Sequence, residues 1–325
     1  MSKKGNTPST LFEAVEYFKD EDMARAFFAD IRWPDGVVRC PHCGSDSVHW
    51  LVKQKRWQCR GKHKRLQFSV KVGTVFEESP IPLGKWLVAV WLEINAKNSI
   101  SSFELARALG TTQKTAWFVL HRVRLALSGG TFEKMSGEIE SDATYIGGLG
   151  VNMHAAKRKA KIKGKTGMSD KTAVLGVLER SGEDKASRIA AKVLPVVRRS
   201  DLHGMIDEHV EPGSHIYTDA WVAYRRMNPK FNHEYIDHEQ GYVRDKTHTN
   251  GLENFWSLFK RCVKGTHVSI MPFHLQAYVD SEAFRFNHRK LNDGQRFMEA
   301  MRGTIGKRLM YQELKSRADT FGVID

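Results

Sequence analysis

The spacing of apolar residues changes twice along the chain and separates three kinds of segment. Between residues 48 and 60, "VHWLVK" and "RWQCR" alternate like the two strands of a short hairpin. From residue 81, apolar residues recur every three or four positions, which is the period of a helix. Here "SSFELARALG" begins with serine and ends with glycine, and "TTQKTAWFVLHRVRLAL" follows at once. This pattern predicts two helices joined by a short turn.

From residue 137 onward, the pattern is that of strands followed by alternating helices and strands. "EIESDATYIGG", "TAVLGVLER" and "ASRIAAKVLPV" have the composition of three consecutive strands. A helix (SDLHGMIDEHV), a strand (GSHIYTDAW), a short helix (WVAYRRM) and a strand (HEYIDH) follow, and two long helices end the region. The order β-β-β-α-β-α-β-α predicts a mixed sheet with helices on its faces.

The charge balance indicates a polyanionic partner. The 325 residues include 51 Lys or Arg and 37 Asp or Glu, which gives a net charge of +14. Such an excess keeps a protein soluble, and it also favours binding to nucleic acid. No apolar run approaches the roughly 18 residues of a membrane span, and the polar start "MSKKGNTPST" lacks the core of a signal peptide. We expect a cytoplasmic protein that has no membrane partner.

Three of the four cysteines have the spacing of a zinc site. Two are separated by two residues, the third lies in the second strand of the predicted hairpin, and a histidine comes four positions later. Two such pairs around a hairpin supply the four ligands of one tetrahedral Zn²⁺, which stabilises the fold and takes no part in catalysis. The expected ligands are Cys40, Cys43, Cys59 and His63. His42 and His49 are alternatives for the fourth position.

The two helices after residue 100 have the pattern of a helix-turn-helix. In that motif the second helix enters the major groove of DNA. Its apolar residues are spaced for one buried face, and Lys114 and Arg122 are available on other faces. Many helical hairpins bind nothing, so the case for DNA contacts by Lys114 and Arg122 depends on the overall charge and the neighbouring zinc site.

Two aspartates lie in apolar strands, where a charge is costly. Asp142 is part of the run "DATYIGG", and Asp219 follows "HIYT". We expect both aspartates at strand ends. A buried carboxylate is tolerated mainly when it is paired or binds a metal, so the two residues are candidate metal ligands.

A third carboxylate, Glu253, has two interpretations. It shares a helix face with Lys260, seven residues later. Alternatively, Asn250 caps this helix and Glu253 completes a capping box. Three clustered carboxylates repel one another by roughly 4 kcal/mol per pair at 4 Å and an effective dielectric constant near 20. Divalent cations relieve this repulsion, and oxygen ligands favour Mg²⁺ or Mn²⁺. Two such ions form the clamp that promotes in-line attack on a phosphodiester.

Four ordered motifs resemble the DDE-type insertion-sequence transposases. They are "CPHC…CRGKH…QFSVKVGTVFEES", "ESDATYIGG", "IYTDAW" and "THTNGLENFWSLFKR", and the resemblance extends from about residue 15 to 290. It implies that Asp142, Asp219 and Glu253 form the catalytic, Mg²⁺- or Mn²⁺-binding triad, with Asn250 as a rival for the third member. It also implies that Lys260, with the adjacent Arg261, contacts the DNA end. Residue 143 is Ala, where relatives often carry Glu.

The resemblance implies a reaction and a set of partners. A metal-activated water hydrolyses a phosphodiester at each element end, and the freed 3′-hydroxyl attacks target DNA. The expected partner is double-stranded DNA, at element ends and at the target. Because two ends must be held together, a homodimer or larger assembly is expected, associated with the nucleoid. The choice between a cut-and-paste and a copy pathway stays open.

These observations predict a multidomain α/β protein. The expected parts are an N-terminal helical segment (1–36), a zinc ribbon (37–76), a helical DNA-binding region (77–132), an RNase H-like catalytic domain with a mixed sheet flanked by helices (133–290) and a basic helical tail (291–325).

A basic run in "HAAKRKAKIKGKTG" separates the first two strands of the expected sheet. Its residues Lys157, Arg158 and Lys159 are candidate DNA contacts, although such a run is also typical of a solvated loop. Two rival functions remain for the whole chain. One is a DNA-binding regulator whose RNase H-like domain is inert, and the other is an RNase H-like, structure-specific nuclease that cuts without joining.

Overall fold

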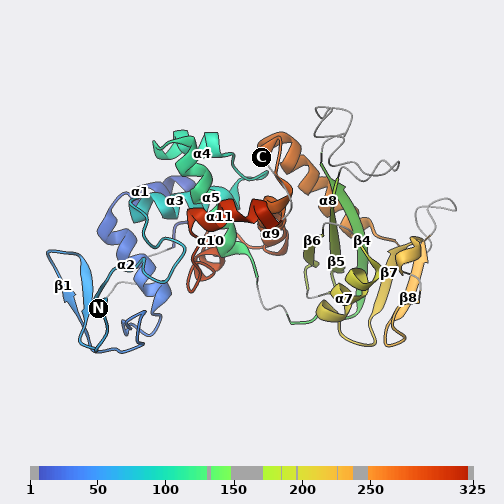
Figure 1. Ribbon diagram of the computed structural model, residues 1–325, viewed down its shortest axis with the longest axis horizontal. Coiled ribbons are helices and arrows are strands. Elements are labelled where there is room, and N and C mark those ends of the chain that lie inside the picture. The colour runs from blue at the N-terminus through green and yellow to red at the C-terminus, as the bar shows by residue number, and fades with distance from the viewer. Residues whose placement is uncertain are drawn as a thin grey trace. The chain divides into compact units, whose positions relative to one another are not determined.

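The computed structural model describes residues 7–129, 133–147, 171–183, 185–194, 197–224, 226–236 and 248–320. Figure 1 labels most of their helices and strands. The chain forms two compact units. The first combines the chain up to Ser128 with the segment Leu291–Asp319, and the second extends from Gly129 to Lys290.

The first unit begins with two short helices that have local caps. Helix α1 covers Leu11–Phe18 and helix α2 covers Glu21–Arg32. The side chain of Asp20 accepts hydrogen bonds from the first free amides of α2, as an N-cap residue does. The rings of Phe18 and Phe27 lie 5.1 Å apart in the core between the two helices.

A three-stranded antiparallel sheet follows, in the order β1-β2-β3. The strands are β1 (Val48–Leu51), β2 (Arg56–Cys59) and β3 (Gln67–Phe68). Trp50 pairs with Trp57 across β1 and β2, which confirms the predicted hairpin. Strand β3 was not predicted, because two residues are too few to show an alternating pattern.

Three helices complete the sequence-continuous part of the first unit. They are α3 (Leu83–Asn95), α4 (Ser102–Leu109) and α5 (Gln113–Leu127). Helix α4 starts at a capping box formed by Ser101 and Glu104 and stops at Gly110, whose φ of 63° is left-handed. The boundaries of α4 and α5 therefore agree with the serine start and the glycine stop seen in the sequence.

The C-terminal segment packs into the first unit and completes its core. Helix α10 covers Asp293–Arg302 and helix α11 covers Tyr311–Thr320. The ring of Phe297 is fully buried and lies 5.2 Å from that of Trp91. Backbone hydrogen bonds also link this segment to the loop after the ribbon, from Val75 N to Thr304 O at 3.0 Å. The basic segment is thus part of a folded unit.

The second unit is built on a five-stranded mixed sheet in the order β6-β5-β4-β7-β8. Its strands are β4 (Glu138–Ile146), β5 (Thr172–Glu179), β6 (Arg188–Leu194), β7 (His215–Asp219) and β8 (Asn232–Ile236). Strand β5 is antiparallel to both β4 and β6, whereas β7 is parallel to both β4 and β8. The predicted mixed sheet is confirmed.

Helices cover both faces of this sheet. Helix α7 (Arg199–His209) packs its buried residues Leu202 and Ile206 against one face. The opposite face is covered by α8 (Asn250–Cys262) and α9 (Leu275–Asn287). Among the residues described in this unit there are also three short helical turns: η2 (Val222–Tyr224), the π-helical η3 (Val263–His267) and η4 (Pro272–His274). No helix among the described residues has the length and apolar character needed to cross a membrane.

Candidate functional site

The four predicted zinc ligands come together at the base of the ribbon. The ligand atoms of Cys40, Cys43, Cys59 and His63 all lie within 4.8 Å of one another. The sulfur atoms of Cys43 and Cys59 are 3.6 Å apart, and Nε2 of His63 is 3.4 Å from the sulfur of Cys40. A tetrahedral zinc with Zn–S bonds near 2.3 Å requires edges of about 3.5–3.8 Å. The donor set and its spacing therefore fit a structural Zn²⁺.

His63 is the fourth member of this cluster, and the alternatives His42 and His49 are not. The loop that brings His63 into place depends on Gly61. A Cβ at this position would lie 3.2 Å from the sulfur of Cys59 and 3.3 Å from that of Cys43. The amide of Gly61 also donates to the Cys59 sulfur at 3.2 Å, as expected for a thiolate knuckle.

Asp142 lies in the middle of β4, so its predicted position at a strand end is wrong. Strand β4 continues to Ile146 and pairs with β5 along its whole length. Asp219, by contrast, is the last residue of its strand, β7. The parallel register pairs Glu140 with Tyr217, and each aspartate lies two residues further along its strand. This register sets the two aspartates on neighbouring strands, which are about 4.8 Å apart, facing the same side of the sheet.

Helix α8 brings Glu253 to the same face of the sheet. The helix approaches closely because β5 has Gly176 at the position that pairs with Asp142. A Cβ at Gly176 would lie only 2.7 Å from the indole ring of Trp256. The indole Nε1 of Trp256 donates a hydrogen bond to Oδ2 of Asp142 at 3.0 Å. Helix α8 is therefore held against the strand that carries Asp142.

Burial and neighbouring charges act on the carboxyl group of Asp142. Its pKa is raised from 3.8 to about 6, chiefly by burial, with further contributions from the charges of Asp219 and Glu253. The amide of Ala143 and the indole of Trp256 oppose this rise by donating hydrogen bonds to the carboxylate. Asp219 and Glu253 are thus both close enough to Asp142 for their charges to act on its carboxyl group.

The start of α8 does not have the capping box that was the alternative role for Glu253. The N-cap residue is Thr249, without a side-chain cap bond, and Asn250 is the first helical residue. The side chain of Glu253 is exposed and lines a cavity of about 610 Å³ together with Asp142. Neither Asn250, the rival for the third position, nor Asp219 lines this cavity.

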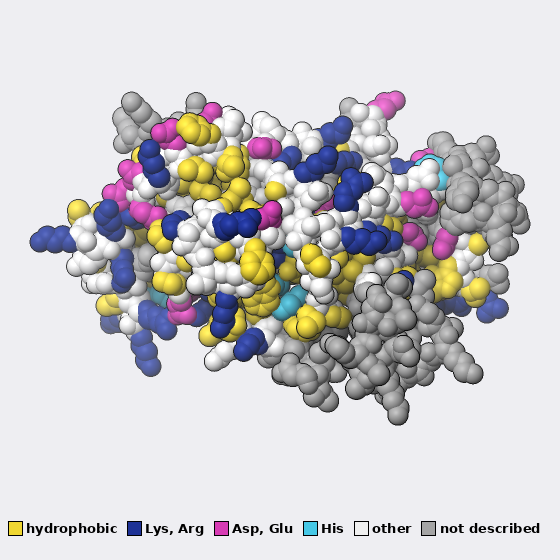
Figure 2. Space-filling model, turned by 90° about the horizontal axis from the view of Figure 1, so that it is seen from above, with side chains coloured by type: hydrophobic (Ala, Val, Ile, Leu, Met, Phe, Trp, Pro, Cys, Tyr) yellow, Lys and Arg dark blue, Asp and Glu magenta, His cyan; other side chains and the backbone are white. Residues whose placement is uncertain are grey.

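Basic side chains border the same cavity. Lys260, Arg261 and Lys264 line it on the side of α8 and η3. Arg261 and Lys264 are exposed and Lys260 is half-buried. Figure 2 shows lysine and arginine side chains (dark blue) interspersed with acidic ones over the described surface. A cavity lined by both carboxylates and cations has the charge pattern needed to hold a phosphodiester near a metal.

The carboxylate oxygens are hard donors and fit Mg²⁺ or Mn²⁺ in kind. The carboxylate oxygens of Asp142, Asp219 and Glu253 lie farther apart than the four zinc-ligand atoms. Within the described ranges, the zinc cluster is the one group of three or more His, Cys, Asp or Glu whose ligand atoms come close enough to hold an ion. A shared ion would draw the side chains of Asp142, Asp219 and Glu253 together.

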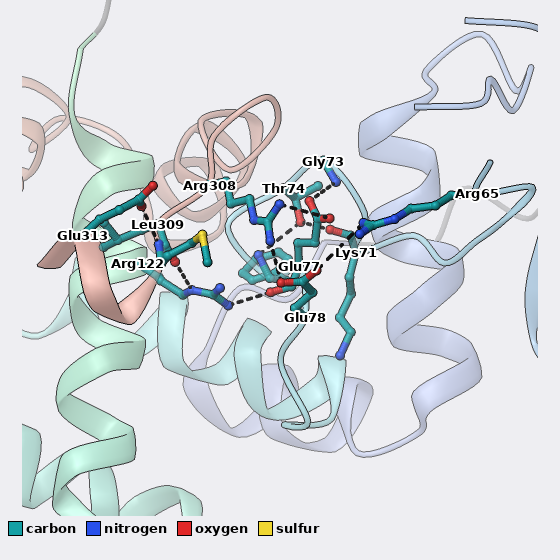
Figure 3. A network of polar contacts seen from close by, with 12 residues as sticks. Arg65, Lys71, Gly73, Thr74, Glu77, Glu78, Arg122, Arg308, Leu309 and Glu313 are labelled. Carbon is teal, nitrogen blue, oxygen red and sulfur yellow. Dashed lines mark hydrogen bonds and ion pairs between the residues drawn. The ribbon is translucent and has the colours of Figure 1, made fainter. Parts of the chain in front are cut away.

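Arg122 is not available for the predicted DNA contact. Its side chain is 5% exposed, and its guanidinium donates to the backbone oxygens of Leu309 and Glu77 at 3.0 and 2.9 Å. Figure 3 shows Arg122 directed at these two residues, beside Arg308 and Glu78. Helix periodicity did not reveal this role, because the covering residue Leu309 belongs to the distant C-terminal segment.

Lys114 lies on the exposed first turn of α5, with its ammonium group 5.3 Å from the centre of the Tyr311 ring. It is accessible for the predicted DNA contact. The basic residues Lys157, Arg158 and Lys159 lie outside the described residues.

The sequence pattern missed two residues that shape the site. Trp256 was assigned only to the apolar face of its helix, and its indole N–H contact with Asp142 is invisible to that pattern. Glu140 was taken as part of a strand, yet it is 1% exposed and accepts a hydrogen bond from the amide of Leu252 at 2.9 Å. The one available signal was a buried-strand glycine, Gly176, which typically marks a close approach.

Comparison with known proteins identifies the class of the two units. Residues 134–287 match the ISXO2-like transposase domain, and residues 19–62 match the transposase zinc-ribbon domain. A protein of the transposable element ISH50 from Halobacterium salinarum is 28% identical over 286 residues, which cover 83% of this chain and 94% of the relative. A transposase-like protein from Haemophilus influenzae is 29% identical over 105 residues, covering 32% of this chain and 85% of the relative.

A zinc ribbon followed by a transposase domain defines the class as insertion-sequence transposases. The chain is thus similar to DDE-type insertion-sequence transposases, with a match to the transposase zinc ribbon followed by a match to the ISXO2-like transposase domain.

Proposed function

We propose that this protein is a DNA transposase that binds the ends of its element and catalyses phosphodiester hydrolysis and strand transfer. Its catalytic residues are Asp142, Asp219 and Glu253. The observation that carries this proposal is the cavity lined by Asp142 and Glu253, with Lys260 and Arg261 at its edge. The electrostatic effect of Asp219 and Glu253 on Asp142 supports the grouping of the three acids.

The sheet of the second unit supports an RNase H-like catalytic domain. Three antiparallel strands, β6-β5-β4, are extended by the parallel strands β7 and β8, with helices on both faces. This is the mixed sheet that the resemblance implies. The two aspartates come from its adjacent central strands, β4 and β7.

The residues of the site have separate tasks in this proposal. Divalent ions held by the three carboxylates would supply Lewis-acid activation of the nucleophile and stabilise the leaving oxygen. Asp142 is oriented for this task by its bonds from Ala143 N and Trp256 Nε1, at 2.7 and 3.0 Å. Lys260 and Arg261 bind phosphates of the DNA end and hold it over the acids.

The two steps of the proposed reaction require neither a covalent enzyme intermediate nor ATP. Water attacks a phosphodiester at the element end, which leaves a 3′-hydroxyl on one product and a 5′-phosphate on the other. The hydroxyl then attacks a phosphodiester of the target, and the new P–O bond replaces the one that breaks.

The first unit recognises double-stranded DNA in this proposal. Helices α4 and α5 form a helix-turn-helix, and the exposed first turn of α5 presents Lys114 to the major groove. The zinc ribbon adds phosphate contacts through its basic surface. A homodimer or larger assembly holds the two element ends together.

The test is a cleavage and strand-transfer assay on the DNA that naturally flanks this gene, with Mg²⁺ or Mn²⁺. The wild type is compared with Asp142→Asn and with Asp207→Asn, an ion-paired surface aspartate on α7. We expect joined products from the wild type and from Asp207→Asn, and none from Asp142→Asn. Nicking without joining would instead indicate a nuclease, and binding without cutting would indicate a regulator.

A further inference from the structure

We infer that Glu140 and Arg180 are positioning residues that fix the first turn of α8, and therefore Glu253, relative to Asp142. The catalytic meaning of this inference rests on the proposed function. We call the contacts of Glu140 with Arg180 and with the amide of Leu252 the clamp. Glu140 is 1% exposed.

Within its own segment, the start of α8 has a long bond from the amide of Asn250 to Nδ1 of His248, at 3.4 Å. The side chain of its N-cap residue, Thr249, makes no cap hydrogen bond. The amide of Leu252 instead donates to Oε2 of Glu140, on strand β4, at 2.9 Å. The first amides of a helix have no partner within the helix and favour a negative charge. Glu140 therefore supplies from the sheet a charged cap for the amide of Leu252, in the first turn of α8.

Glu140 and Asp142 are coupled through the geometry of the strand. They lie two residues apart on β4, and side chains two residues apart point to the same face of a sheet. The strand thus presents one carboxylate to the start of α8 and the next to the cavity. Any change in how Glu140 holds the helix alters the position of Glu253 relative to Asp142.

Arg180 completes the clamp from the end of β5. Its Nε donates to Oε1 of Glu140 at 2.9 Å, and its Nη2 donates to the backbone oxygen of His248 at 2.6 Å. Nη2 also lies 3.0 Å from Nδ1 of His248, which acts as an acceptor there. The guanidinium is 4.3 Å from the centre of the Tyr217 ring on β7. One side chain thus connects three strands to the residues that lead into α8.

Gly251 shows how closely the helix is fitted to Glu140. A Cβ at this position would lie 2.9 Å from Oε2 of Glu140 and 3.1 Å from Cδ2 of Leu178. Neither neighbour has room to move, because both side chains are buried. The contact between the carboxylate and the helix start therefore requires glycine here.

The clamp and the indole contact lie on either side of Glu253. Leu252, the preceding residue, is bonded to Glu140, and Trp256, three residues later, is bonded to Asp142. Glu253 is thus anchored twice to the same strand. Loss of one anchor lets the helix start shift, and a misplacement of 1 Å costs about 100-fold in rate.

The test uses the full-length protein with Glu140→Gln, an isosteric change whose amide cannot accept from both Arg180 and Leu252. Hydrogen exchange of the metal-free protein should accelerate by about 10-fold at the amides starting α8, because a bond to a charged acceptor is lost. In the cleavage assay, kcat should fall about 10- to 100-fold while KM for the DNA stays within about twofold. The Mg²⁺ concentration at half-maximal rate should rise about 10-fold, as for outer partners of metal ligands.

Glu179→Gln is the matched control. Glu179 is also a buried glutamate on the sheet, and it likewise accepts from an arginine, Arg188, and from a backbone amide, that of Ser136. Neither of these bonds involves a residue of α8. We expect wild-type exchange at α8 and wild-type kcat in this variant.

A second pair of variants tests the same clamp without removing a charge. Gly251→Ala should displace the start of α8 and reproduce the loss of kcat and the faster exchange. Its control is Gly204→Ala in α7, where an added Cβ would meet nothing within 4 Å. This control should keep the wild-type rate.

The outcomes separate the clamp from the proposed function. Wild-type exchange and wild-type kcat in Glu140→Gln would overturn the inference, as would equal losses in Glu140→Gln and Glu179→Gln. A wild-type protein that does not cut DNA would overturn the proposed function alone. In that case faster exchange at α8 in Glu140→Gln and Gly251→Ala, but not in their controls, would still support the clamp.

Discussion

The carboxyl group of Asp142 is under opposing influences. Burial raises its pKa to about 6, and the negative charges of Asp219 and Glu253 act in the same direction. The amide of Ala143 and the indole of Trp256 hold the carboxylate by hydrogen bonds and lower the pKa in part. The group is therefore firmly oriented, and its charge is costly in the metal-free protein.

This cost predicts a pH dependence of stability. The folded-state pKa of Asp142, about 6, lies above its ordinary value of 3.8, so the folded state binds the proton more tightly. Lowering the pH from 7.5 to 5 should therefore stabilise the metal-free wild type by about 1 kcal/mol relative to Asp142→Asn. Urea unfolding of both proteins across this pH range measures the difference. A constant difference would contradict the assigned environment.

The identity of the fourth zinc ligand gives a second prediction for a single residue. His63→Ala should lose the bound zinc and the folded ribbon, because its Nε2 completes the Cys₃His cluster. His42→Ala is the control and should retain one zinc per chain, since His42 lies outside the cluster. Metal analysis of the purified proteins, with tryptophan fluorescence of the ribbon, distinguishes the two variants. Equal zinc content would show that another side chain replaces His63.

At the scale of elements, the contact between α8 and β5 depends on the absence of one side chain. Gly176 leaves room for Trp256 and Leu252, which would lie 2.7 and 2.8 Å from a Cβ at that position. The indole can then reach over β5 to Asp142 on the next strand. A helix packed at this distance has no room for even one methyl group.

Gly176→Ala should therefore push α8 away from the sheet and destabilise the second unit by about 1–3 kcal/mol, the usual cost of overpacking. Strand transfer should fall as well, because Glu253 moves with the helix. Gly182→Ala, where the added Cβ meets nothing within 4 Å, should leave both quantities unchanged. Urea unfolding and the strand-transfer assay test the two effects. Wild-type stability of Gly176→Ala would argue against the described packing.

Most elements could be predicted from the sequence because their patterns are local. The strands around Trp50, Trp57 and Asp219 and the helix stop at Gly110 follow from alternation, periodicity and turn residues. The position of Asp142 within β4 could not be predicted in this way. The glycines after Ile146 suggested a strand end near Asp142, whereas the ending strand is its neighbour β7.

The candidate site was predictable only in part for a similar reason. Acidic residues in apolar strands are visible in the sequence, so Asp142 and Asp219 were found. The contacts of Glu140, Arg180 and Trp256 join segments up to 114 positions apart. Arg122 was misassigned because the residues that bury it are also distant, with Leu309 lying 187 positions away.

At the scale of the whole molecule, the first unit is made of two separated segments. Residues up to Ser128 and the segment Leu291–Asp319 share one core, and the second unit is formed by the chain between them. Phe297 from the later segment packs against Phe18, Phe27 and Trp91 from the earlier one. Neither segment can bury these rings without the other.

Phe297→Ala should accordingly destabilise the first unit by about 3–5 kcal/mol, the usual cost of truncating a buried phenylalanine. Phe103→Ala is the control, because Phe103 on α4 is 67% exposed. Thermal unfolding followed by tryptophan fluorescence should show a lower transition temperature in the first variant only. Similar transitions in both variants would mean that the C-terminal segment is not required for the core.

The discontinuity of the first unit also sets an order of events during synthesis. A ribosome releases the chain from its N-terminus, so Phe297 emerges only after the entire second unit has been made. The growing chain therefore carries a complete second unit before its first unit has a finished core. Under the proposed function, in which the first unit binds DNA, a protein cut short within its second unit would not occupy element ends and would not compete there with the intact enzyme.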